Sequence, residues 1–175
     1  MDDFPKKSSV SFFCYGDCYK DLNPYREDLR NDMKRDDRDV LRDVQKETWE
    51  AMTVIDTLLD RAIEDQFSME LSRQALQYAG IHNRAVEQLL DKQGNVYRGN
   101  HIDEFLLKSE IHADTMFNIS TQHLANLMIQ KSTKGLTGMW RTMKHHQMAS
   151  QECMELAQEL AGLEEEVIQK YREFL

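Results

Sequence analysis

The sequence predicts an all-α fold, an antiparallel up-down-up-down four-helix bundle preceded by an irregular N-terminal arm. Composition is the first reason, because only two prolines and seven glycines occur among 175 residues, and strong helix formers such as Leu, Glu, Gln, Met and Ala are abundant. Apolar residues also recur at spacings of three and four along most of the chain. The connections between these segments are short, so neighbouring helices are expected to run in opposite directions.

The chain is expected to divide into an arm at 1–24 and a helical domain at 25–175. The arm contains both prolines and shows no sustained helical period. At its end, Asn23 and Pro24 supply an N-cap and the first residue of a helix. Cys14 and Cys18, separated by three residues, could supply half of a zinc site or form a redox-sensitive disulfide. The alternative is that the arm is chemically inert.

Two helices are expected in the first half of the domain, one at about 36–65 and one from there to the run KQGNVYRGN at 92–100. Their apolar stripes predict the buried faces. The stripes consist of Val40, Val44, Thr48, Ala51, Ile55, Leu58 and Ala62 in the first helix and of Phe67, Leu71, Gln74, Tyr78, His82, Ala85 and Leu89 in the second.

Two more helices are expected in the second half, at about 101–131 and from about 136 to the C-terminus. Gly135 is interpreted as the left-handed stop between them. The predicted inward faces consist of Ile102, Phe105, Ser109, His112, Met116, Ile119, His123 and Leu127 in the third helix and of Met139, Met143, His146, Ser150, Met154, Ala157, Ala161 and Ile168 in the fourth.

Charge and cysteine content limit the function classes. The formal net charge is −9, which argues against nucleic acid as a partner because phosphate binding requires a basic surface. Three cysteines form no even disulfide framework, and the N-terminus lacks the apolar run of a signal peptide. No window of about twenty apolar residues exists to span a membrane. A cytoplasmic protein that is not embedded in a membrane is therefore expected.

Polar residues within the predicted inward faces suggest two layers. Folding the chain at its loops places His82 and His112 at one height with Glu47 beside them, and a second layer would combine His123, His146 and Glu70. Convergent His and Glu from several helices can bind a transition metal such as iron, manganese or zinc. Alternatively, the histidines are neutral, hydrogen-bonded core residues that fix the helix register.

Helix lengths and internal histidines over about 36–175 resemble the ferritin-like helical bundles, which implies metal storage or redox chemistry. Those proteins use Glu-x-x-His on two helices; this chain contains only the reverse order once, at His101 and Glu104. The segment HHQMASQECMELAQELAGLEEE also resembles uncharacterised bacterial helical-bundle proteins.

Catalytic motifs are missing from the sequence. There is no Gly-x-Ser-x-Gly turn and no glycine-rich phosphate loop, which favours a non-enzymatic protein. Ten methionines and an apolar C-terminal segment are typical of surfaces that join a second chain. The first hypothesis is therefore an assembly or partner-binding module, either a homodimer or a binder of another protein. The second is a metal-binding bundle.

Overall fold

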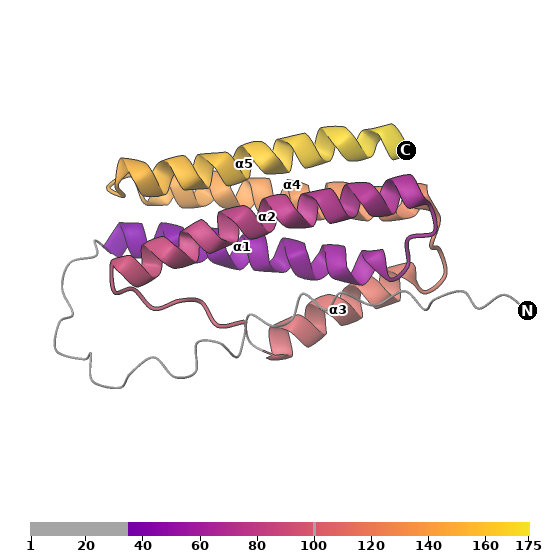
Figure 1. Cartoon of the computed structure of the whole chain (residues 1–175), viewed down its shortest axis with the longest axis horizontal. Helices are drawn as coiled ribbons and strands as arrows, with labels where there is room; N and C mark the ends of the chain where they lie inside the picture. Colours follow the sequence, from indigo (N-terminus) through magenta and orange to yellow (C-terminus); the bar gives the residue numbers. More distant parts are fainter. Residues whose placement is uncertain (1–34, 100) are drawn as a thin grey trace, which may run out of the picture. The chain divides into compact units, whose positions relative to one another are not determined.

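The computed structural model describes residues 35–99 and 101–175, and the helices are drawn in Figure 1. The described residues are all-helical, with no strand. The elements are α1 (Arg35–Leu59), α2 (Asp65–Asp91), α3 (His101–Thr115), α4 (Thr121–His145), α5 (Gln151–Tyr171) and a final 3-10 turn, η3 (Arg172–Phe174). The predicted arm at 1–24, with Cys14 and Cys18, lies outside the described residues.

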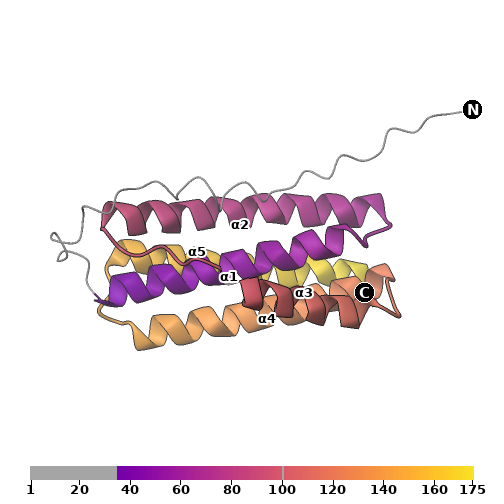
Figure 2. The ribbon, with the colours of Figure 1, turned by 90° about the horizontal axis from the view of Figure 1, so that it is seen from below.

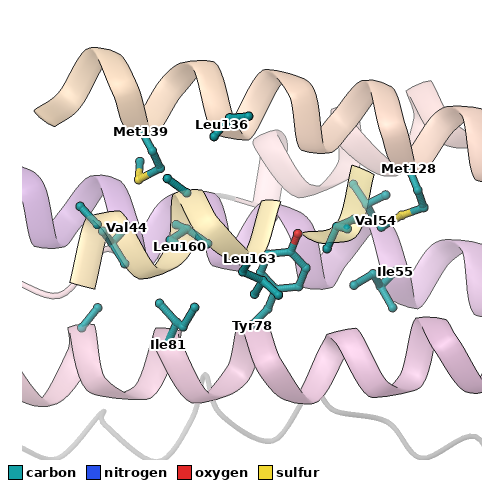
Figure 3. Close-up of a cluster of buried hydrophobic side chains, with 14 of the residues drawn as sticks. Val44, Val54, Ile55, Tyr78, Ile81, Met128, Leu136, Met139, Leu160 and Leu163 are labelled. Atoms are coloured by element: carbon teal, nitrogen blue, oxygen red, sulfur yellow. The ribbon is translucent and has the colours of Figure 1, made fainter. Parts of the chain in front are cut away.

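The first two helices bury the faces that their apolar stripes predict. Val44 and Leu58 of α1 are fully buried, as are Phe67 and Tyr78 of α2. Side chains of α4 and α5, among them Met139, complete the same core (Figure 3). No described helix combines the length and the apolar character that spanning a bilayer requires.

The third predicted helix is wrong, because the chain leaves the helix at 116–120 and starts a new one. The Ser120 side chain accepts a hydrogen bond from the backbone N–H of His123, and the Asn118 side chain accepts one from the backbone N–H of Ser120. These bonds satisfy N–H groups at the start of α4 that have no partner within the helix. The segment therefore forms two helices, α3 and α4, instead of one.

The predicted boundary at Gly135 is also wrong, because this residue lies in the middle of α4 and is buried. The break comes later, at 146–150, where His146 is the C-cap of α4 and Ser150 the N-cap of α5. Asp37 holds this turn, since its carboxylate accepts a hydrogen bond of 2.6 Å from the backbone N–H of Ser150.

Helix directions follow from contacts near the start of α1. Lys92, just after α2, lies 4.0 Å from Asp37 of α1 and 3.3 Å from Glu152 of α5. At the other end, Phe67 near the start of α2 stacks on Tyr171 at the end of α5. Thus α1 and α5 run one way, whereas α2 and α4 run the other way (Figures 1 and 2).

The predicted up-down-up-down order of the four long helices is therefore wrong. Consecutive helices do alternate in direction, as short connections require. The break at 116–120 adds α3 to the series, so α2 and α4 are no longer consecutive and run in the same direction.

The short helix α3 lies against α1 (Figure 2). Ile111 and Thr115 are its only fully buried side chains among those described. Phe105 and Met116, which were expected to point inward, are mostly exposed. The inward face predicted for this segment is therefore wrong, because the face that packs on α1 includes Leu107 and Ile111 instead.

Candidate functional site

Two glutamates lie inside the protein at one small cavity. Glu47 of α1 and Glu164 of α5 both line this cavity, together with Tyr78 of α2 and Ser132 of α4. Its volume is about 30 Å³, which is room for about one water molecule. Glu164 is only 2% exposed. We call this space the carboxylate cavity.

Two glycines of α4 make room for the carboxylates. A Cβ atom at Gly135 would lie 2.8 Å from Oε1 of Glu164, and one at Gly138 would lie 3.1 Å from Oε1 of Glu47. The two glycines are three residues apart and therefore lie on the same side of the helix. The absence of side chains there lets both glutamates pack against the α4 backbone.

Glu164 is held by hydroxyl groups and no cation pairs with it among the described residues. The Tyr78 hydroxyl donates a hydrogen bond of 2.8 Å to Oε2 of Glu164, and Figure 3 shows this hydroxyl pointing into the core. Burial raises the pKa of Glu164 to about 7; Glu47 also raises it, while the hydrogen bonds from Tyr78 and Ser132 lower it. Burial likewise raises the pKa of Tyr78, with Glu164 contributing.

Glu47 titrates in the same range as Glu164. Burial raises the pKa of Glu47 to about 7, with a further rise from Glu50 and a smaller one from Asp43. Lys134 and Lys46 act in the opposite direction. The cavity therefore holds two carboxylates that take up and release protons near neutral pH.

The helix α3 also contributes to the cavity, through Leu107. Lys131 of α4 lines the cavity as well, and its Nζ lies 2.9 Å from the Glu110 carboxylate of α3. Side chains from all five helices thus border the carboxylate cavity, and α3 is tied to it by an apolar contact and an ion pair.

The first predicted histidine layer forms only in part. His82 lies beside Thr48, with 3.0 Å between the ring Nδ1 and the hydroxyl oxygen, and burial lowers the pKa of His82. A neutral, hydrogen-bonded imidazole is therefore expected there. His112 is on α3 and is bonded to Arg61 on the surface, so the structure does not bring it to His82 or into a metal site with Glu47.

The second predicted layer does not form, because His123 and His146 belong to the same helix. They lie at opposite ends of α4, about 35 Å apart at 1.5 Å per residue. His123 contacts the backbone oxygen of Asp114 at 2.9 Å, and Nδ1 of His146 lies 3.5 Å from the Asp36 carboxylate. Glu70 is bound to Arg73. Across 35–99 and 101–175, no three His, Cys, Asp or Glu side chains are grouped to hold a metal ion.

Sequence reasoning missed Glu164, which reads as part of the charged run LEEEV. A signal was present, however, because Glu164 lies three residues after Ala161 and four before Ile168, on the predicted buried stripe. The pair Gly135 and Gly138 within a helical pattern was a second signal.

Comparison of the chain with protein-family models, with curated proteins and with solved structures found no match.

Proposed function

We propose that this protein is an assembly module in which α1, α2, α4 and α5 form a four-helix bundle and α3 presents an apolar surface to a second copy of the chain. The observation that carries this proposal is the exposure of four large apolar side chains. Phe105 is 69%, Leu106 60%, Met116 69% and Phe117 90% exposed. We call these four residues the α3 surface.

The helix α3 has apolar residues on two sides, and only one side is covered. Leu107 and Ile111 pack on the core. On the other side, Ser109 and Ala113 continue the stripe from Phe105 toward Phe117 at helical spacing. A helix that is apolar on both sides is normally buried on both, and monomeric proteins seldom expose continuous apolar patches. A second chain would cover the open side.

Charge favours a second copy as that chain. The two edges of the α3 surface are formed, at the same spacing of seven and four residues, by Asp103, Glu110 and Asp114 on one side and by His101, Lys108 and His112 on the other. When two such helices pack in parallel about a twofold axis, each acidic edge meets the other copy's basic edge, as in a parallel coiled coil. The surface is therefore complementary to itself.

The first test is the mass of the protein in solution. We expect a dimer for the wild-type chain and a monomer for the double variant Phe105→Glu, Phe117→Glu, because each new carboxylate would have to be buried in the interface. Light scattering on a sizing column measures this. The matched control is Leu76→Glu, an exposed apolar residue of α2, which should remain dimeric. A wild-type chain that stays monomeric at all concentrations would contradict the proposal and leave the surface to another protein.

A charge exchange tests the orientation. The variant Asp103→Lys, Asp114→Lys and the variant His101→Glu, His112→Glu should each dimerise less than the wild type, because like charges then face each other. Mixing the two variants should restore a dimer, since opposite charges meet again on both edges. Equal dimerisation of all samples would show that these edges do not contact the partner.

A further inference from the structure

We propose that the carboxylate cavity controls how firmly α3 is seated on the other helices, and thereby controls the α3 surface; this inference rests on the proposed function. Protonated Glu47 and Glu164 would keep α3 seated, and their ionisation would loosen it.

The cavity cannot hydrate an ionised carboxylate without a change in its walls. An ionised carboxylate needs several hydrogen-bond donors or a cation when it leaves water. Glu164 already uses the hydroxyls of Tyr78 and Ser132, and the cavity admits about one water. Ionisation of Glu47 therefore requires either more water or a lysine.

The charged groups that face the cavity come from α1 and α4. Glu50 lies on its own helix with Glu47, and Lys131 and Lys134 face both from α4. Lys134 lies 4.0 Å from Glu50, and Lys131 is bound to Glu110 of α3. Tyr78 is the titratable group from α2 and Glu164 the one from α5, whereas the α3 residue that lines the cavity is the apolar Leu107.

Both responses to ionisation weaken the seat of α3. Water can enter if Leu107 moves away, and α3 is the helix with the fewest buried side chains to hold it in place. If Lys131 turns inward to a carboxylate, it leaves Glu110 and breaks its ion pair with α3. No comparable route exists through the longer helices, whose buried faces form the core.

The direction of the effect with pH follows from the raised pKa values. The seated form holds its protons up to pH of about 7, whereas a hydrated glutamate loses its proton near 4.5. Loosening therefore becomes easier as pH rises from about 4.5 to about 7 and then changes no further. Below that range α3 is held most firmly.

Amide hydrogen exchange of α3 is the test, measured on the monomeric chain so that self-association cannot protect the helix. The Phe105→Glu, Phe117→Glu variant serves if the wild type is a dimer. Protection factors remove the direct effect of pH on exchange chemistry. We expect those of α3 to fall about tenfold between pH 5 and pH 7.5, the effect of about one unit of linked pKa change, while those of α2 stay high.

The variant Glu47→Gln, Glu164→Gln should keep α3 equally protected at both pH values, because glutamine has the same shape and no charge to gain. Glu164→Gln alone serves if the double variant folds poorly, and should lose part of the response. The control Glu165→Gln, exposed on the same helix, should respond as the parent does. A pH response that survives in the double variant, or no response in the parent, would overturn the inference. Neither result depends on whether the chain dimerises.

Discussion

Replacing Glu164 by Gln is expected to raise the free energy of unfolding at pH 7.5 by roughly 3 kcal/mol. Burial raises the pKa of this carboxyl from 4.5 to about 7 in the folded chain, so keeping it ionised there costs about 1.36 kcal/mol for each unit of the shift. Glutamine keeps the shape of the side chain and can still accept the hydrogen bond from Tyr78.

The gain should depend on pH in a defined direction. Because the folded chain binds the proton more tightly than the unfolded chain, the stability contributed by protonated Glu164 is present in full below pH of about 4.5 and is lost as pH rises to about 7. The advantage of the variant should therefore be small at pH 4 and largest above pH 7. Urea unfolding at pH 4, 6 and 7.5 measures it.

The exposed neighbour Glu165 provides the control for this experiment. Glu165→Gln removes the same charge from the same helix without touching the cavity, and surface changes of this kind are usually worth less than about 0.5 kcal/mol. If Glu164→Gln destabilised the chain at pH 7.5, the carboxyl would have to be better satisfied inside the protein than its burial indicates.

The second large effect is expected at Gly135, whose replacement by Ala should destabilise the chain by about 1–3 kcal/mol. The added Cβ would lie 2.8 Å from Oε1 of Glu164. Glu164 can yield only by giving up its bonds to Tyr78 and Ser132 inside the protein. This loss outweighs the gain of roughly 1 kcal/mol that alanine brings to a helix. Thermal or urea unfolding at pH 6 measures the difference.

Gly80 provides the matched comparison for Gly135. It also lies within a helix, α2, but a Cβ there would meet no atom within 4 Å. Gly80→Ala should therefore stabilise the chain by about 0.5–1 kcal/mol. Opposite signs for the two substitutions are the expected result; a stabilising Gly135→Ala would show that the carboxylate moves aside at little cost.

Local patterns were sufficient for the first half of the domain and insufficient for the second. In α1 and α2 a strong apolar stripe coincides with the buried face, as at Val44 and Phe67. In α3 apolar residues occupy both sides, so the stripe through Phe105 was as regular as the one through Ile111, and only packing on α1 distinguished them. Ser120 and Ser150 are ordinary N-cap residues, but a continuing apolar period concealed the breaks before them.

The candidate site shows the same division. His82 and Thr48 were placed together correctly because both lie on the stripes of the first two helices. His123 and His146 were assigned to separate helices because the break was expected at Gly135, and this one displaced boundary removed the second layer.

By itself, the sequence determined that the described chain is helical and which faces of α1 and α2 are buried, because helix propensity and apolar period act over a few neighbouring residues. Only the tertiary structure decided that α2 and α4 run in the same direction, that α3 keeps an open apolar face, and that Glu164 rather than a histidine pair occupies the interior. Each of these depends on which helices meet and at what height. A close approach such as that of Gly135 to Glu164 joins residues 29 positions apart, a relation that no local pattern contains.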